Sequence, residues 1–350
     1  MQNIETYWDA LIDWALATKS SDILFTSGRV FGRVDTKVVL YPGEQPSSTE
    51  FYVEAVRFPI PSPVHAAELD GPRGSSDFAF SKKDTRFRYN IYRGYGGFFA
   101  ACRPLPKKSF TATQIGIDER ILQMVAETKK GLILVTGPTG SGKSSTICCL
   151  IDYLNANFNY NIITIEDPIE YLFTPRKSII AQREVGLHVD SFSTALRAAM
   201  RENPDVIFVG EIRDLETAMA ALQAAETGHI VFATLHTQRV YSTISRIIDI
   251  APTEKQSEIR SVLSHTLRMV LGQRLLRKIG GGVVAAREVF INVPAAENLI
   301  RTGKEKQIQN VMTTNRAMGM IDWESAVDEL YRNSIIDQTE YKGHKDEASN

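Results

Sequence analysis

The chain has 350 residues, more than a single hydrophobic core usually serves, so we expect at least two domains. Apolar residues make up 43% of the chain and charged residues 23%, and the 40 basic and 41 acidic residues leave a formal charge of −1. The lack of a basic block argues against nucleic acid as a partner, and the lack of an apolar run of about 18 residues argues against direct membrane insertion. We therefore expect a cytoplasmic protein that reaches a membrane only through partners.

The first part of the chain predicts a small α/β domain built on an antiparallel sheet. Apolar residues at helical spacing from Tyr7 to Leu16 predict an amphipathic helix. Short strand-like runs follow, and the last two form a hairpin across Gly94–Gly97. The predicted strands are Ile23–Phe25, Val30–Phe31, Val38–Leu40, Phe78–Phe80, Arg86–Tyr92 and Phe98–Arg103. We assign residues 1–105 to this domain, and the proline-containing polar stretch at residues 106–113 to a linker.

The second predicted domain covers residues 114–350 and has a different pattern. Apolar runs alternate with helical segments, which is typical of a parallel sheet with helical crossovers. The predicted strands are Leu132–Val135, Ile162–Ile165, Val206–Val209 and Ile230–Ala233, and the predicted helices between them are Ser144–Asn155, Thr194–Met200 and Leu215–Glu226. From about residue 251 we expect mainly helices, with one strand-like pair around Val283–Val293.

A glycine-rich loop follows the first strand of this domain. Its residues are Gly137, Pro138, Thr139, Gly140, Ser141, Gly142, Lys143 and Ser144, followed by Ser145. The order Gly, four residues, then Gly-Lys-Ser is the phosphate-binding P-loop pattern, in which glycines let successive N–H groups face one anion. Lys143 would meet the β- and γ-phosphates of a bound nucleotide, and Ser144 would give an oxygen to Mg²⁺.

Polar residues follow the other predicted strands. Glu166 ends the second strand, Gly210 and Glu211 follow the third, and His236 follows the fourth. Ligands of open parallel sheets bind beyond the carboxyl ends of the strands, so we expect these side chains near the P-loop. Together they could support magnesium-assisted transfer of a phosphoryl group to water.

The roles of the two glutamates are open to more than one interpretation. We assign Glu211 to Mg²⁺ and its water shell and Glu166 to activation of the attacking water, and the reverse order is the alternative. Glu166 could instead cap a helix before Pro168, and His236 could be a structural histidine at a strand end rather than a γ-phosphate sensor.

Arginines of the first domain are further candidates. An arginine supplied by another domain or subunit can stabilise a transferred phosphoryl group. Arg86 and Arg103 lie on the predicted hairpin and are our candidates for this role, and a solvated surface position is the alternative for each.

Several ordered motifs resemble those of the ATPases of the type II/IV secretion superfamily. Ile163–Glu170 resembles their Asp box, Arg201–Asp214 their Walker B segment, including its glycine before the glutamate, and Thr227–Thr237 their His box. Within the superfamily the chain most resembles PilT-type retraction ATPases of type IV pili, because Glu297–Lys304 looks like their C-terminal AIRNLI motif. Ala296-Glu297 departs from that motif where Ala-Ile-Arg would stand.

The resemblance implies a fold, an assembly and a partner. It implies an N-terminal PAS-like domain, a RecA-like P-loop domain with a helical C-terminal region, and a ring-shaped homo-hexamer that hydrolyses ATP. It further implies that arginines of the first domain reach the nucleotide, and that the ring docks on an inner-membrane platform protein to power pilus retraction.

Other functions remain as alternatives. An ATPase of a type IVB secretion or conjugation system belongs to the same superfamily. A RecA-type nucleic-acid translocase would bind DNA with a steep salt dependence, which the neutral charge disfavours. A P-loop switch or scaffold would bind ATP without useful turnover, and the combination of Glu166, Glu211 and His236 disfavours it.

Overall fold

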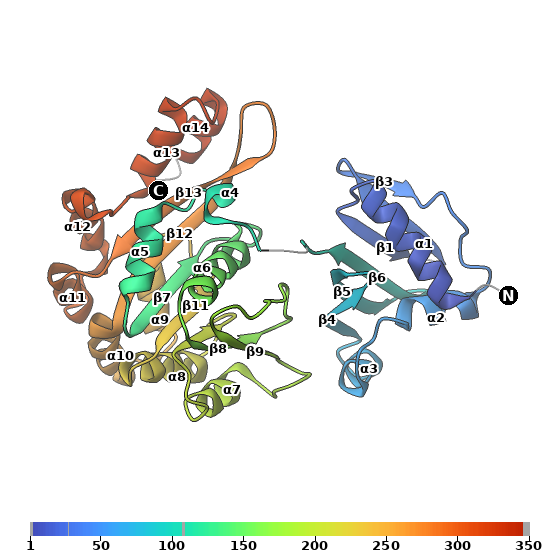
Figure 1. The fold of residues 1–350 in the computed structure, drawn as a ribbon, viewed down its shortest axis with the longest axis horizontal. Helices are drawn as coiled ribbons and strands as arrows, with labels where there is room; N and C mark the ends of the chain where they lie inside the picture. Colours follow the sequence, from blue (N-terminus) through green and yellow to red (C-terminus); the bar gives the residue numbers. More distant parts are fainter. Residues whose placement is uncertain (1–2, 27, 107–108, 346–350) are drawn as a thin grey trace. The chain divides into compact units, whose positions relative to one another are not determined.

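The computed structural model describes residues 3–26, 28–106 and 109–345 of the chain. It divides into two compact units (Figure 1). The first unit contains the described residues up to 106 together with Asp167–Leu172 and Arg183–Asp190, and the second contains the remaining described residues. Two residues of the predicted linker, 107 and 108, lie outside the described residues. In the described part of the chain, no helix combines the length and apolar character needed to cross a bilayer.

The described residues of the first unit form a six-stranded antiparallel sheet with three helices. The sequence predicts the antiparallel sheet and the first of these helices. The strand order is β3-β2-β1-β6-β5-β4. Its elements are α1 (Ile4–Ala17), β1 (Asp22–Thr26), β2 (Arg29–Val34), β3 (Lys37–Leu40), α2 (Thr49–Arg57), α3 (Pro63–Asp70), β4 (Ser75–Lys82), β5 (Thr85–Gly94) and β6 (Gly97–Pro104). The buried Trp8 of α1 packs against aromatic rings of the sheet and donates its indole N–H to the carbonyl of Ala55 at 2.9 Å. The ring contacts attach α1 to the sheet, and the hydrogen bond attaches it to the neighbouring helix α2, which contains Ala55.

The second unit is built on a seven-stranded sheet with the order β13-β12-β7-β11-β10-β8-β9. Its strands are β7 (Gly131–Thr136), β8 (Asn161–Glu166), β9 (Ile179–Glu184), β10 (Val206–Val209), β11 (Ile230–Leu235), β12 (Leu267–Arg277) and β13 (Val283–Ile291). Its α-helices are α4 (Ala112–Ile115), α5 (Glu119–Glu127), α6 (Lys143–Asn157), α7 (Phe192–Ala199), α8 (Leu215–Glu226), α9 (Val240–Asp249), α10 (Thr253–Thr266), α11 (Pro294–Arg301), α12 (Ile308–Thr314), α13 (Trp323–Arg332) and α14 (Gln338–Lys345).

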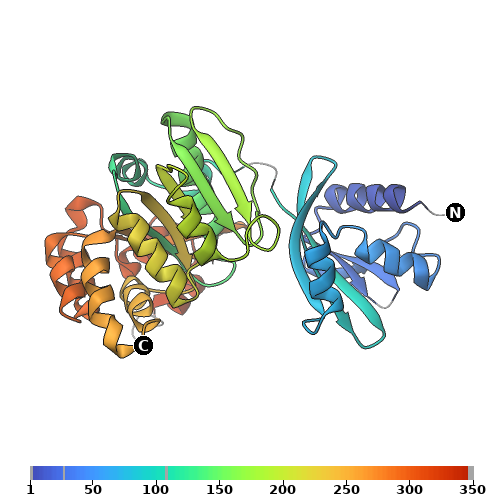
Figure 2. The ribbon, with the colours of Figure 1, turned by 90° about the horizontal axis from the view of Figure 1, so that it is seen from below.

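The direction of the crossovers places the helices on the two faces of this sheet. The chain passes from β7 to β8 in one direction along the strand order and then returns through β10 and β11 to β12. Because such crossovers are right-handed, α6 lies on one face and α7 to α10 lie on the other (Figures 1 and 2). The core on the α6 face joins α5 and α6 to alternate residues of β7, among them Ile133 and Val135.

The predicted strands β7, β8, β10 and β11 and the predicted helices α6, α7 and α8 are all present. The described region after residue 251 is mainly helical, as expected, and departs from the expectation at one strand, β12. The strand expected near residue 283 is β13, but its partner β12 follows α10 without an intervening loop, in a stretch that we expected to be helical. β12 is formed because it pairs in parallel with β7 on one side and antiparallel with β13 on the other.

Candidate functional site

The glycine-rich loop joins β7 to α6 as a tight turn. Gly140 and Gly142 have φ values of 78° and 85°, in the left-handed region that favours glycine. A Cβ atom on Gly137 would lie 2.2 Å from the carbonyl oxygen of Gln273, so only glycine fits there. Helix α6 begins at Lys143 with no side-chain cap on its N-terminus. The N–H groups of its first turn therefore face the loop, as in a phosphate-binding helix terminus.

Two polar side chains of the loop point to an anionic ligand. Within the described part of the chain, the buried hydroxyl oxygen of Ser141 has no hydrogen-bond partner. Buried hydroxyl groups of folded proteins usually have one, so a ligand or a water molecule is expected there. The ammonium group of Lys143 donates to the carbonyl oxygens of Gly137 at 2.8 Å and Pro138 at 3.1 Å. It thus lies directly over the loop, where it would meet a phosphate.

Three of the predicted residues form one chain of contacts at the carboxyl edge of the sheet. The Lys143 ammonium nitrogen lies 3.2 Å from Nδ1 of His236, which follows β11. Nε2 of the same ring lies 3.2 Å from Oε1 of Glu211, which follows β10. Arg213 donates to the other Glu211 oxygen at 2.7 Å. The imidazole therefore connects the P-loop lysine to the carboxylate, with a basic group at each end.

Glu166 lies at the same edge of the sheet, at the end of β8. Glu166 is 5% exposed, and its carboxylate accepts hydrogen bonds from Thr164 at 2.7 Å and from Gln182 at 3.1 Å. β8 is separated from β7 by β10 and β11, so its end lies roughly 14 Å from the P-loop strand at ordinary strand spacing. A nucleotide that extends from the P-loop along this edge would approach Glu166 with its terminal phosphate.

The structure explains why glycine precedes Glu211 where P-loop proteins usually carry an aspartate. A Cβ atom on Gly210 would lie 3.2 Å from the carbonyl oxygen of Ile165, 3.3 Å from the ring of Phe192 and 3.4 Å from Cα of Glu166. The Gly210 N–H also donates to the Ile165 carbonyl at 2.8 Å. The two acidic strand ends are therefore packed backbone to backbone, and a side chain at position 210 would separate them.

The sequence analysis missed a residue that supports the P-loop from β12. Gln273 is buried, donates to the carbonyl of Ser141 at 2.6 Å and accepts from the hydroxyl of Thr146 at 2.8 Å. Its neighbour across the hairpin is Arg287, which donates to the carbonyl of Gly116 at 2.8 Å. Burial lowers the pKa of Arg287 to about 10. The signal in the sequence is weak, because Gln273 lies in a stretch that reads as helical and Arg287 is a single charged residue in a strand-like run.

An apolar cavity of about 540 Å³ lies beside the P-loop. Ser145 and Thr146 of α6 line it together with Gln273 and Arg287. The rest of its wall is mainly apolar, from Phe110, Ile115, Leu275, Val283, Val284 and Ile335. Its size and mainly apolar lining with a few polar groups are typical of small-molecule sites.

The two candidate arginines make contacts within the first unit. Arg103 donates to the buried carboxylate of Asp22 at 2.9 Å, and its side chain is 63% exposed. Arg86 donates to the carbonyl of Ile169 at 2.6 Å and to Glu184 at 3.2 Å. Both arginines are therefore held by carboxylates here, and Arg103 presents most of its surface to solvent.

The protein side chains alone do not form a metal site in the described part of the chain, where no group of three or more His, Cys, Asp or Glu side chains is placed to hold an ion. The hydroxyl of Ser144 and the carboxylate of Glu211 are the hard oxygen donors that Mg²⁺ prefers. Because both Glu211 oxygens are already engaged by His236 and Arg213, this carboxylate fits a contact through water better than direct coordination.

The sequence and the structure of this chain are similar to those of several known proteins. The family model described as "Type II/IV secretion system protein" matches residues 1–342. The chain is 47% identical over 246 residues to a protein of Pseudomonas aeruginosa named type IV pilus retractation ATPase PilT, covering 70% of this chain and 71% of that protein. It is 44% identical over 262 residues to a twitching motility protein of Neisseria gonorrhoeae, covering 74% and 70%. A crystal structure of the pilus retraction motor PilT with bound ADP superposes with a TM-score of 0.86 at 42% identity, covering 97% of this chain and 96% of that one.

Proposed function

We propose a function from the premise that the chain belongs to the type II/IV secretion system protein family, as an ATPase of that family. We propose that it is the cytoplasmic motor that couples Mg-dependent hydrolysis of ATP to ADP and phosphate to the retraction of a type IV pilus. The observation that carries the proposal is the contact chain from Lys143 through His236 to Glu211 beside an anion-binding loop. The names of the relatives, which describe retraction and twitching motility, support its mechanical part.

In the proposed site the P-loop residues from Gly137 to Ser145 bind the phosphates of ATP. The N–H groups of the loop and of the α6 terminus would surround the β-phosphate, and Ser141 would gain the partner that its buried hydroxyl lacks among the described residues. Lys143 would leave the loop carbonyls to contact the β- and γ-phosphates. The nucleoside would extend into the adjoining cavity of about 540 Å³, which is large enough for a base and ribose.

Magnesium would be held mainly by phosphate oxygens and the Ser144 hydroxyl, with Glu211 acting through the water shell. When bound, the ion would neutralise charge that develops on the transferred phosphoryl group. His236 would respond to the γ-phosphate, because it contacts both Lys143 and Glu211. Glu166 would hold and deprotonate the attacking water, a role that suits a largely buried carboxylate.

The remaining parts of the proposal concern assembly. We propose that six copies form a ring, that Arg86 and Arg103 stabilise the phosphoryl group from the first domain or from a neighbouring copy, and that the ring lies on the inner membrane through a platform protein. The exposed Arg103 could exchange Asp22 for a phosphate, since both are anions that suit a guanidinium.

The experiment that tests this function is deletion of the gene in its own host. We expect deletion to leave cells that carry pili but do not twitch, and the wild-type gene but not Lys143→Ala to restore movement. Cells without pili would instead indicate an assembly motor, and normal twitching with loss of DNA or protein transfer would indicate a secretion motor.

A further inference from the structure

A buried carboxylate outside the nucleotide site holds the segment that carries His236. Glu288 lies in the middle of β13 and is 1% exposed. Its cross-strand neighbour on β12 is Gly272, and a Cβ atom there would lie 3.3 Å from Oε2 of Glu288 and 3.7 Å from the hydroxyl of Thr136. The absence of a side chain at Gly272 therefore gives the carboxylate room beside β7, next to the residue that precedes the P-loop.

The carboxylate of Glu288 caps helix α9. Its Oε2 accepts a hydrogen bond from the N–H of Val240, the first residue of α9, at 2.9 Å. The residue before α9 is Arg239, whose side chain provides no acceptor for the first turn. Glu288 thus gives a free N–H of the first turn an acceptor from another strand, and its charge suits the positive end of the helix.

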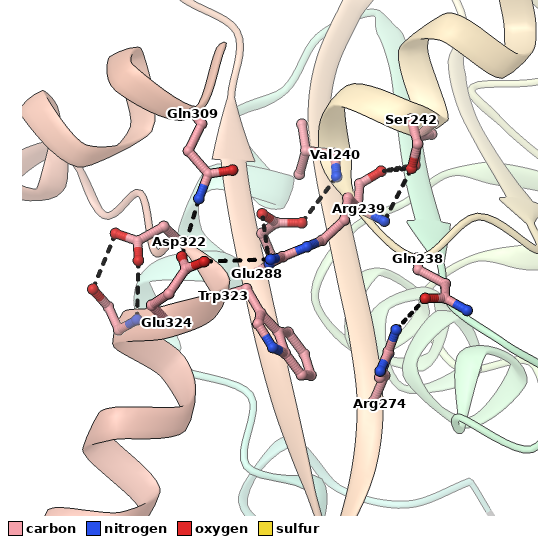
Figure 3. A network of polar contacts seen from close by, with 12 residues as sticks. Gln238, Arg239, Val240, Ser242, Arg274, Glu288, Gln309, Asp322, Trp323 and Glu324 are labelled. Carbon is pink, nitrogen blue, oxygen red and sulfur yellow. Dashed lines mark hydrogen bonds and ion pairs between the residues drawn. The ribbon is translucent and has the colours of Figure 1, made fainter. Parts of the chain in front are cut away.

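The guanidinium group of Arg239 also contacts side chains of α13 (Figure 3). It lies 4.0 Å from Glu288 and 3.3 Å from Glu324, and its central carbon lies 5.8 Å from the centre of the Trp323 ring. Arg274 of β12 stacks on the same ring at 5.3 Å and contacts Gln238. Charged and aromatic groups of β12, β13 and α13 therefore converge on residues 238–240.

The start of α9 is also connected to the strands that carry the nucleotide site. The hydroxyl of Thr243 lies 2.7 Å from that of Thr237 and 3.4 Å from that of Thr136. Only residues 236–239, which we call the histidine loop, separate the end of β11 from the start of α9. In so short a connection, a shift of Val240 must move His236 relative to Lys143.

We propose that Glu288 is a positioning residue for ATP hydrolysis, which fixes the first turn of α9 and through it sets His236 against Lys143 and Glu211. This inference rests on the proposed function, because it assumes that His236 takes part in turnover. Displacements of about 1 Å in a catalytic group can cost on the order of 100-fold in rate, so loss of the cap should appear in kcat.

The first test compares three variants of Glu288 in the full-length protein by steady-state ATP hydrolysis. Glu288→Met removes the acceptor while keeping the volume, and we expect kcat to fall about tenfold or more with KM for ATP changed by less than about threefold. Glu288→Gln keeps an oxygen in reach of the Val240 N–H, and we expect near wild-type turnover. Glu288→Asp withdraws the carboxylate by about one bond length, ~1.5 Å, and we expect an intermediate kcat if the protein folds like the wild type.

A matched control is Glu305→Gln. Glu305 is also a buried carboxylate of the second unit, and it pairs with Arg260 rather than with the histidine loop. We expect this variant to lower thermal stability without changing kcat. Equal kcat losses in Glu305→Gln and Glu288→Met, or wild-type kcat in folded Glu288→Met and Glu288→Asp, would overturn the inference.

The second test separates this inference from the proposed function by a double-mutant cycle with His236→Ala. We expect His236→Ala to lower kcat, and Glu288→Met to lower it no further, within about twofold, in that background. If Glu288→Met lowers kcat equally in both backgrounds, Glu288 acts independently of His236 and the inference is wrong, while the proposed function stands. If His236→Ala turns over ATP normally, the proposed role of His236 fails and the positioning role fails with it.

Discussion

The ammonium nitrogen of Lys143 lies 3.2 Å from Nδ1 of His236, which joins the P-loop to the loop after β11 without an intervening residue. Because a lysine donates and cannot accept, Nδ1 is the acceptor in this contact, and Nε2 then carries the proton toward Glu211. The histidine is thereby oriented by both neighbours. A phosphate that draws Lys143 away would remove one of the two contacts of the imidazole. Occupancy of the P-loop and the orientation of His236 are therefore coupled.

Replacement of Lys143 by alanine should abolish turnover. We expect kcat to fall by about 100-fold or more, because the loop loses the charge that faces the transferred phosphoryl group. The measurement is release of inorganic phosphate by the full-length protein. The control is Lys130→Ala. Lys130 is an exposed lysine directly before β7, at the opposite edge of the sheet, and this variant should hydrolyse ATP at the wild-type rate. Retained turnover in Lys143→Ala would contradict the proposed phosphate site.

Substitution of the two glutamates should change different kinetic properties, kcat for Glu166 and the Mg²⁺ requirement for Glu211. Glu166→Gln should bind ATP with near wild-type affinity and lose at least about 100-fold in kcat, because the water loses its base. Glu211→Gln should shift the Mg²⁺ concentration needed for half-maximal activity upward. Titration of Mg²⁺ at saturating ATP distinguishes the two, with exposed Glu226→Gln as the control. A shifted Mg²⁺ requirement in Glu166→Gln alone would reverse our assignment.

Gly210 should not accept a side chain. In Gly210→Ala the new methyl group would press on Ile165, Phe192 and Glu166 at 3.2–3.4 Å, so we expect a loss of about 1–3 kcal/mol in the free energy of unfolding. Chemical denaturation measures this loss. Gly343→Ala in helix α14, where a Cβ atom meets nothing within 4 Å, should be neutral or stabilising. Equal stability of the two variants would show that the strand ends separate easily.

Removal of Gln273 should weaken the P-loop, which it supports through Ser141, and should alter one wall of the cavity proposed for the nucleoside. Gln273→Leu loses the hydrogen bonds to Ser141 and Thr146, and we expect KM for ATP to rise and the free energy of unfolding to fall by about 1–3 kcal/mol. Gln256→Leu is the control, since Gln256 donates only to the carbonyl of Ala251 among the contacts described for it. An unchanged KM in Gln273→Leu would mean that the loop holds its shape unaided.

Glu288 should make stability depend on pH. Burial raises the pKa of Glu288 from 4.5 to about 7, against the opposing effects of the Val240 N–H and Arg239 and with the help of Glu324 and Asp322. Between these two pKa values the folded state keeps a proton that the unfolded state has released, so stability falls as pH rises through this window. Over the window the loss is about 3 kcal/mol.

The variant Glu288→Gln has no such proton to lose. Urea unfolding at about pH 5 and about pH 8 should therefore show the wild type losing stability relative to Glu288→Gln as pH rises. Parallel pH profiles for the two proteins would contradict the assignment of this effect to Glu288.

The sequence predicted the parts of this fold that local pattern controls. The four central strands are short apolar runs bounded by polar residues, and the P-loop is a motif of fixed spacing, so β7, β8, β10, β11 and α6 were found near their observed bounds. β12 was missed because Leu267–Arg277 is rich in leucine, arginine and other good helix formers and directly follows a helix. Its strand conformation comes from pairing with β7, which no local pattern reports.

The supporting residues of the site were missed for the same reason. Lys143 belongs to a motif of fixed spacing, and Glu211 and His236 each follow a recognisable strand. The contacts among the three agree with their predicted convergence. Gln273 and Glu288 act through a backbone carbonyl and a helix N-terminus contributed by segments far away in the sequence. Nothing in the residues around them identifies those partners.

The alternation of side chains along β12 and β13 places Arg287 on the face of α6 and Glu288, its immediate neighbour, on the face of α9. Insertion or deletion of a single residue within β13 would exchange the two, putting a guanidinium group against the positive end of α9 and a carboxylate under the P-loop helix. The length of this strand is therefore constrained from both faces at once. Changes of length are expected to be tolerated only in the glycine-rich turn at residues 278–282 that closes the hairpin.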